Sequence, residues 1–310
     1  MLVWVVLVFT TVLSVHMWLW SKGLLLSRLT DIANISEEKN LPFVMWFGPS
    51  PVLIFVDIDD VKAVTNAFVD KPYYYSFGKI WLGEGLVTAS VPIWKHNIKI
   101  LSGTFTSSVV AGYQSVYNAQ AQRLVSTLRA RAGAEPFDAL HILALVTLET
   151  ICQTALGECG VSERIVSKEY YNAFDRAVTL LMARGLNLLL HPDAVYRLTP
   201  GHREITNCVG LMHSIADTII AKRRKEWDEK KKQGLKDAKE SGNFDQTRFK
   251  SFLEILFEIS ERDPSMTPQQ VRAEVDTILV AGQETVATAL FYALLMIGCH
   301  SDVQHRLYSE

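Results

Sequence analysis

The longest apolar stretch of this chain constrains its fold more than any other feature. Thr267 can cap a helix, Pro268 suits the first helical position, and Gln270 can reach back to close a capping box. Apolar residues then recur up to the stop signal Gly298, so the pattern predicts a helix over about 267–299 that is roughly 45 Å long. A helix of that length crosses a whole domain, and the other elements must pack around it.

Within this predicted helix, the segment 280–289 places a carboxylate beside a hydroxyl. Ala281 and Gly282 precede Thr285 by four and three positions, so the three residues share a face with little side-chain bulk. Thr285 can donate its hydroxyl to the carbonyl of Ala281, whereas Glu284 needs a partner or water. The spacing leaves two interpretations open: a helix crossing that requires small residues, or an active site that a flat ligand approaches.

Length and charge limit the possible classes of protein. The chain has 310 residues and is 49% hydrophobic, which is enough for one large domain. Its formal net charge is -2, and acids interrupt the basic run 222–232, so nucleic acid is not an expected partner. The cysteines show no spacing typical of a zinc site, and we interpret them as reduced thiols. They are Cys152, Cys159, Cys208 and Cys299.

The N-terminal stretch is apolar. Residues 1–20 contain no Asp, Glu, Lys or Arg and match the length of a bilayer helix, which predicts a membrane anchor over 1–21. A cleaved signal peptide is the alternative, but the stretch lacks a basic N-terminal region and a small-x-small cleavage site. The first cations, Lys22 and Arg28, follow the span, which predicts that residues 22–310 lie in the cytoplasm.

The region after the anchor predicts a small amount of β-structure. Two apolar runs flank Gly48-Pro49-Ser50-Pro51, which is typical of a hairpin over 43–56. The segment Lys71–Ser90 is rich in aromatic residues and glycine, and we expect a loop there, either a substrate lid or an ordinary surface loop. From residue 114 onward the periodicity is helical, so the predicted fold class is mainly α with a small β part.

Pro92 begins a further predicted helix, over about 92–105, that contains Trp94 and several cations. Taken alone, this helix is best interpreted as amphipathic with a solvated basic edge. The polar segment 233–246 is expected to be flexible.

Two motifs resemble one known family. Residues 281–285, Ala-Gly-Gln-Glu-Thr, are similar to the small-Gly-x-acid-Thr motif in the long central helix of the cytochrome P-450 family of haem-thiolate monooxygenases. Residues 82–88 followed by Trp94 resemble the loop that precedes the family's Trp-x-x-x-Arg helix. The order of anchor, hairpin, aromatic loop, Trp helix and Glu-Thr helix also fits. The resemblance implies a truncated cytochrome P-450 fold of microsomal type.

The resemblance also implies roles for individual residues. Glu284 would pass protons inward and Thr285 would hydrogen-bond the activated dioxygen, a relay that needs an acid and a hydroxyl on one helix. The implied haem-binding residues are Trp94, Ala281 and Gly282, and the implied substrate-binding residues are Leu82, Val280 and Ala281.

Two features depart from the family's pattern. The position of the Arg that helps to hold a haem propionate is Ile98 here, and compensation by Lys95, His96 or Lys99 stays open. The Glu-x-x-Arg helix and the Cys loop that supplies the iron ligand would lie beyond Glu310, and none of the four cysteines sits in such a loop.

The function that the resemblance implies is haem-dependent insertion of one oxygen atom from O2 into an apolar small molecule. Electrons would come from an NADPH-dependent reductase, with cytochrome b5 as a further partner, at the endoplasmic reticulum membrane. The alternative is a catalytically inactive, membrane-anchored helical fragment that lacks the haem thiolate ligand.

Overall fold

The computed structural model describes residues 42–47, 50–157, 168–241 and 250–309. The predicted anchor and Cys159 lie outside these residues. The chain divides into two compact units, Met1–Asp70 and Lys71–Glu310.

The described part of the first unit is a hairpin followed by a helix. Strands β1 (Phe43–Phe47) and β2 (Ser50–Ile54) pair antiparallel, with Phe43 opposite Ile54. Ser50 and Pro51, expected in the turn, belong to β2 instead, because Ser50 pairs with Phe47. Proline is tolerated here because each strand of a two-stranded sheet is an edge.

Helix α3 (Ile58–Ala67) follows the hairpin. The Asp57 side chain accepts hydrogen bonds from the amides of Asp59 and Asp60, at 2.9 and 3.2 Å. These bonds satisfy two of the amides that a helix start leaves without intrahelical partners.

The described part of the second unit is helical and contains no strand. Its elements in chain order are η1 (Tyr73–Gly78), α4 (Lys79–Leu82), α5 (Val91–Leu101), η2 (Ser102–Phe105), α6 (Ser107–Ala111), α7 (Gln114–Arg129), α8 (Ala139–Ile151), η3 (Cys152–Leu156), α10 (Lys168–Leu186), η4 (Leu188–Leu190), α11 (Asp193–Tyr196), α12 (Pro200–Ser241), α13 (Phe252–Arg262), α14 (Pro268–Cys299) and α15 (Ser301–Ser309). The fold class is therefore mainly α with a small β part, as predicted.

Two expectations about loops were wrong. Much of the aromatic segment 71–90 is helical, because η1 and α4 occupy residues 73–82. The polar segment 233–246 is helical up to Ser241, where a connecting loop was expected, and its residues 242–246 lie outside the described residues.

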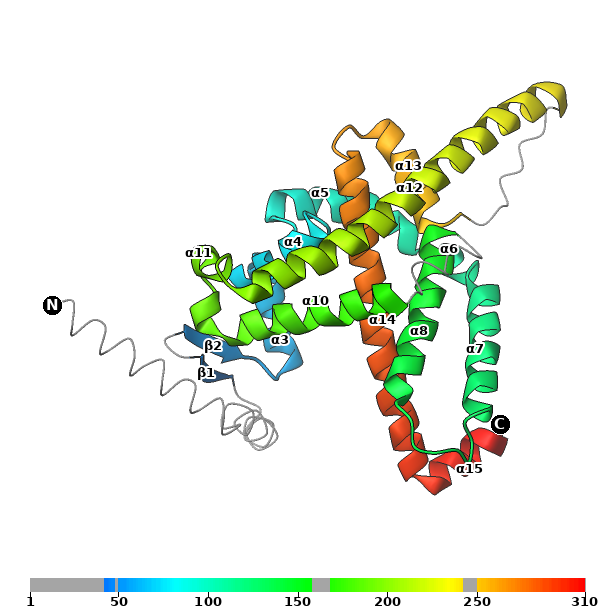
Figure 1. Ribbon diagram of the computed structural model, residues 1–310. Coiled ribbons are helices and arrows are strands. Elements are labelled where there is room, and N and C mark those ends of the chain that lie inside the picture. Colours follow the sequence, from blue (N-terminus) through cyan, green and yellow to red (C-terminus); the bar gives the residue numbers. More distant parts are fainter. Residues whose placement is uncertain (1–41, 48–49, 158–167, 242–249, 310) are drawn as a thin grey trace. The chain divides into compact units, whose positions relative to one another are not determined.

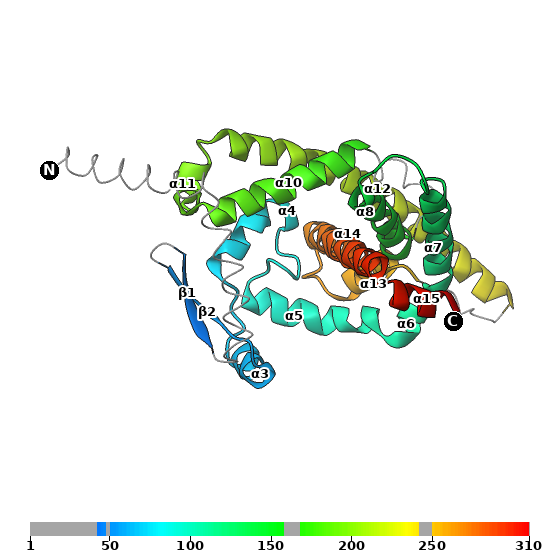
Figure 2. The same cartoon turned by 90° about the horizontal axis from the view of Figure 1, so that it is seen from below.

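Helix α14 is the axis of this unit. In Figures 1 and 2 it passes along α8, beside α10 and α12, with α5 on its other side. Six large core residues, each at most 1% exposed, come from α14 itself and from five helices around it. They are Leu101 of α5, Leu148 of α8, Phe174 of α10, Met212 of α12, Leu253 of α13 and Leu279 of α14. Complete burial of such a side chain contributes about 1.5–3 kcal/mol.

Two described helical stretches, Ala139–Leu156 and Pro268–Cys299, are long and apolar enough to cross a membrane. The first is 50% buried within the chain, and the second carries the buried carboxylates of Glu274 and Asp276. We interpret both as core helices, because a core helix meets the same criteria of length and composition.

Candidate functional site

The first half of α14 is held by a buried carboxylate that sequence reasoning missed. Glu274 is 1% exposed and accepts hydrogen bonds from Asn97 Nδ2 at 3.0 Å, Gln270 Nε2 at 2.9 Å and the Leu86 amide at 3.1 Å. Burial raises the pKa of this carboxyl, although the three donors act in the opposite direction. The bonds attach α5 and the segment after α4 to α14. The sequence signal that could have identified Glu274 is an acidic residue at a position of the predicted helix that is otherwise surrounded by apolar residues.

Gln270 does not complete the capping box that the sequence predicted. Its amide donates to Thr267 Oγ1 at 3.2 Å, so the first half of the motif is present. Its side chain donates instead to Glu274 and to the Glu84 carbonyl, at 2.9 Å each. The Gln270 side chain therefore binds residues distant in the fold instead of closing the capping box at Thr267.

The glycine-rich pattern after α4 has a packing explanation. A Cβ at Gly85 would lie 2.2 Å from Thr277 Oγ1 and 2.5 Å from the Ala273 carbonyl oxygen. Only glycine allows this backbone to lie so close to α14. Lys71 Nζ then donates to the carbonyls of Leu86 and Val87, at 2.5 and 2.7 Å.

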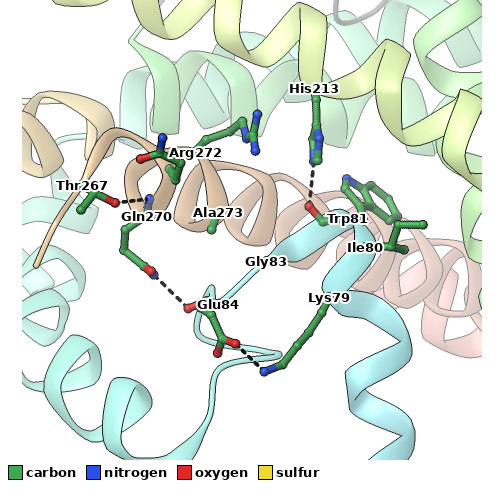
Figure 3. Close-up of a pocket in the computed structure, with 11 residues that line it drawn as sticks. Lys79, Ile80, Trp81, Gly83, Glu84, His213, Thr267, Gln270, Arg272 and Ala273 are labelled. Atoms are coloured by element: carbon green, nitrogen blue, oxygen red, sulfur yellow. Dashed lines mark hydrogen bonds and ion pairs between the residues drawn. The ribbon is translucent and has the colours of Figure 1, made fainter. Parts of the chain in front are cut away.

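A small cavity of about 230 Å³ lies between α4, α12 and the start of α14 (Figure 3). Its charged groups are largely paired: Lys79 Nζ is 2.5 Å from Glu84 Oε1, and Arg272 Nη1 is 3.1 Å from Asp217 Oδ2. This pairing leaves no concentration of one charge at its rim. The cavity is separate from the Glu-Thr segment, which begins three turns later on α14.

That Glu-Thr segment lies on the second half of α14 and is open. Ala281, Glu284 and Thr285 are exposed, and no described residue forms a hydrogen bond or ion pair with Glu284. Thr285 Oγ1 donates to the Ala281 carbonyl at 2.5 Å, as the sequence predicted. An acid and a hydroxyl therefore stand next to each other on an exposed helix face.

Gly282 is not on that open face, which corrects the expectation that it shares one with Ala281 and Thr285. A Cβ at Gly282 would lie 2.7 Å from Ile151 Cγ1 and Cδ1, so glycine allows α8 to cross α14 closely. The helix-crossing interpretation is therefore correct for Gly282, and the active-site interpretation stays a prediction for its neighbours. Gly282 serves a helix crossing, and its neighbours form the open face.

The other predicted site residues are spread over three helices. Leu82 is 6% exposed at the end of α4, and Val280 is half-buried against the main core. Trp94 is half-buried on α5. Segment 82–90 contacts α14 near Ala273, about three turns before the Glu-Thr pair. The structure thus places Val280, Ala281, Glu284 and Thr285 on one stretch of α14, whereas Leu82 and Trp94 lie on other helices.

The structure bears on which cation could replace the Arg that is absent at position 98, where Ile98 is 38% exposed. His96 Nε2 lies 2.7 Å from Asp263 Oδ2 and 3.0 Å from Ser265 Oγ, so this imidazole is already engaged at the turn before α14. The side chains of Lys95 and Lys99 are exposed and form no hydrogen bond or ion pair with other described residues. Compensation for the missing Arg by either lysine stays a prediction.

The described cysteines do not resemble a thiolate ligand facing the open segment. Cys152 is buried and burial raises its pKa strongly, while burial also raises the pKa of Cys208, so both favour the thiol. Cys299 is exposed but stands roughly 21 Å along α14 from Thr285. Among the described residues there is also no group of three or more His, Cys, Asp or Glu side chains that could hold a metal ion.

Comparison with known proteins identifies the family. The family model for cytochrome P450 matches residues 18–310. Cytochrome P450 4c21 of Blattella germanica is 29% identical over 289 residues, covering 91% of this chain and 56% of that protein. Cytochrome P450 4V2 of Mus musculus is 27% identical, with 88% and 53% covered. Cytochrome P450 4c3 of Drosophila melanogaster is 25% identical, with 86% and 51% covered. The chain spans about half the length of these relatives, and it belongs to the cytochrome P450 family.

Proposed function

We propose that this chain supplies the oxygen-binding side of a haem-dependent monooxygenase, which inserts one atom of O2 into an apolar substrate. One observation carries the proposal. Helix α14 is fixed along its first half and presents Ala281, Glu284 and Thr285 together on an exposed face. Family membership supports the same chemistry.

The residues present fit one side of a haem. Ala281 has only a methyl side chain, and the Thr285 hydroxyl is held close to the helix by the Ala281 carbonyl, so a flat ring can approach this face. The Trp94 indole N–H would bind a propionate, with Lys95 or Lys99 replacing the Arg absent at Ile98. When bound, a thiolate-ligated haem supplies the cleavage of the O–O bond. The described cysteines do not supply that thiolate.

Glu284 and Thr285 would move protons to the reacting face. Glu284 is exposed and can collect protons from solvent. Adjacent residues on a helix point about 100° apart, so a water molecule would connect the carboxylate to the hydroxyl. To take part, the Thr285 hydroxyl must donate toward the substrate side rather than to Ala281. Leu82, Val280 and Ala281 would contact the substrate from α4 and α14.

The remaining parts of the proposal concern the cell. Residues 1–21 would anchor the protein in the endoplasmic reticulum membrane, with the domain 22–310 in the cytoplasm. Electrons would arrive from an NADPH-dependent reductase, with cytochrome b5 as a second donor. The apolar composition of residues 1–20 supports the anchor.

The test is the coupling of oxygen use to product formation in haem-loaded protein supplied with reductase. We expect Thr285→Ala to lower product formed per O2 consumed by about 100-fold, the lower end of what a positioned proton donor contributes. Thr288→Ala, on the next turn, is the matched control and should keep its coupling. Unchanged coupling in the Thr285 variant would remove this hydroxyl from the proposed relay.

The inactive fragment is the second candidate, and the state of the described cysteines favours it. Reduced, haem-loaded 310-residue protein exposed to carbon monoxide separates the two candidates. We expect no thiolate-type spectral shift, because Cys152 and Cys208 favour the thiol and Cys299 is remote. Observation of that shift would show that a cysteine of this chain ligates the iron and would eliminate the inactive candidate.

A further inference from the structure

Three elements meet at the imidazole of His213, on α12. Its Nε2 lies 2.8 Å from the carbonyl oxygen of Trp81, on α4, and 3.3 Å from Oδ2 of Asp276, on α14. Figure 3 shows His213 extending from α12 to the Trp81 backbone. The Asp276 side chain is 1% exposed, whereas the His213 side chain is 20% exposed.

The hydrogen bond fixes one proton of the imidazole. A carbonyl oxygen can only accept, so His213 Nε2 carries a hydrogen and donates it to Trp81. The ring is therefore either the neutral Nε2–H tautomer or the cation. Loss of the second proton, from Nδ1, leaves the bond to Trp81 intact and removes the positive charge that faces Asp276.

The Asp276 carboxylate depends on that charge. Neither of its oxygens has a hydrogen-bond partner among the described residues. A buried carboxylate without compensation is strongly unfavourable. The imidazole at 3.3 Å is the cation that can compensate it directly.

The other charged or titratable groups around this pair are engaged or neutral. Arg272 of α14 pairs with Asp217 of α12 at 3.1 Å. Lys79 of α4 pairs with Glu84 at 2.5 Å, on the far side of the cavity. Tyr170 of α10 is 1% exposed, and burial keeps the pKa of its phenol well above the usual range. None of them offers a free charge to replace the imidazolium.

We propose that His213 and Asp276 form a proton-controlled latch. While the imidazole is charged, the latch holds α12 and segment 81–90 against α14, and it loosens when the imidazole becomes neutral. The latch forms part of the wall of the 230 Å³ cavity, so loosening widens that cavity. This inference concerns the packing of the chain itself and does not require a bound haem.

The sign of the pH dependence follows from both groups. The Asp276 carboxylate 3.3 Å from Nε2 raises the pKa of His213 above its usual value of 6.5, and the Trp81 carbonyl acts in the same direction. Stabilisation by the imidazolium is therefore complete below that value and is lost as the pH rises through the folded value. Burial raises the pKa of Asp276 above 3.8, so its ionisation also costs stability as the pH rises. The latch closes in mild acid and opens in mild base.

Hydrogen–deuterium exchange of the full chain in detergent tests the latch, with rates corrected for intrinsic exchange at each pH. We expect amide protection in 205–220 and 81–90 to be lower at about pH 8.5 than at about pH 6, on either side of the imidazole's ordinary value. His213→Gln keeps an Nε2 donor for Trp81 but cannot be charged, so its protection should be low at both pH values.

The double variant His213→Gln/Asp276→Asn contains a neutral pair, and its protection should be restored and independent of pH. Asp276→Asn alone should also lose the pH dependence, which keeps the test valid if a His213 variant fails to fold. His96→Gln is the control, because His96 forms an exposed pair with Asp263 elsewhere on the unit. An unchanged pH dependence in the Asp276→Asn protein, or in a folded His213→Gln protein, would overturn the latch.

Discussion

The two halves of α14 are equally helical but differ in their surroundings. From Val271 to Val280 every residue is buried or half-buried, and from 281 to 299 only Gln283 and Ala287 are buried. Glu274 in the first half accepts three hydrogen bonds, whereas Glu284 in the second has no described partner. The first half holds the helix in place, and the second presents an accessible face.

This difference assigns separate roles to similar residues. The contacts of Glu274 are about 16 Å along the helix from Thr285, and a helix transmits orientation over that distance. The residues around Glu274 therefore help to position the candidate relay without touching it. Paired substitutions in the two halves test this division.

Glu274→Leu should have the largest effect. It leaves the Asn97, Gln270 and Leu86 donors without their acceptor, and unsatisfied buried donors cost about 1–3 kcal/mol each. We expect the free energy of unfolding to fall by about 4 kcal/mol, measured by urea unfolding of the full chain followed by circular dichroism. Glu284→Leu is the matched control and should leave that free energy nearly unchanged.

The pH dependence of the same protein provides an independent check. Burial raises the pKa of Glu274 above 4.5, so above that value the unfolded chain loses this proton before the folded one. The folded state therefore loses stability as the pH rises through the folded value. Glu274→Gln should remove that part of the slope. Equal losses in Glu274→Leu and Glu284→Leu would contradict the division between the halves.

Gly85→Ala should be the next largest change. The added Cβ would overlap Thr277 Oγ1 and the Ala273 carbonyl, and a helix backbone cannot move aside as a side chain can. Overpacking of this kind costs about 3 kcal/mol. Gly103→Ala, where a Cβ would meet nothing within 4 Å, is the control. Similar unfolding midpoints for the two variants would show that segment 82–90 does not depend on close contact with α14.

The sequence predicted the local parts of this arrangement. The Thr267-Pro268 helix start and the bond from Thr285 to Ala281 each involve residues within four positions. Residue pattern is sufficient for such features. The family was also predicted correctly, from the order of the motifs.

The tertiary parts could not be predicted, because their partners are distant in the sequence. The Leu86 amide and Glu274 are 188 positions apart, and no periodicity relates them. Gln270 does not form its predicted capping box, because its side chain donates to the Glu84 carbonyl and to Glu274. The helical period grouped Gly282 with Ala281 and Thr285, but only the position of Ile151 on α8 shows that Gly282 faces a crossing.

Gly282→Ala tests that crossing at the boundary between the two halves. Its Cβ would meet Ile151 Cγ1 and Cδ1 at 2.7 Å, and part of that side chain can rotate away. We expect a loss of about 1–2 kcal/mol in the free energy of unfolding. Adding Ile151→Ala removes the clashing atoms, so the Gly282 substitution should cost less in that background. If Ile151→Ala does not reduce the cost, Gly282 is required for another reason.

Thr285→Ala should have the smallest effect on stability. The hydroxyl is exposed and bonds only to a carbonyl of its own helix, and alanine is a better helix former by about 0.5 kcal/mol, which offsets the lost bond. Thr147→Ala is the contrast, because the buried Thr147 hydroxyl donates across the crossing to the Gln283 carbonyl at 3.1 Å, and its loss should cost about 1 kcal/mol. A clear loss of stability in the Thr285 variant would show that this hydroxyl is structural. An unchanged unfolding midpoint, combined with lost coupling of oxygen to product, would show that the second half of α14 is selected for chemistry rather than for packing.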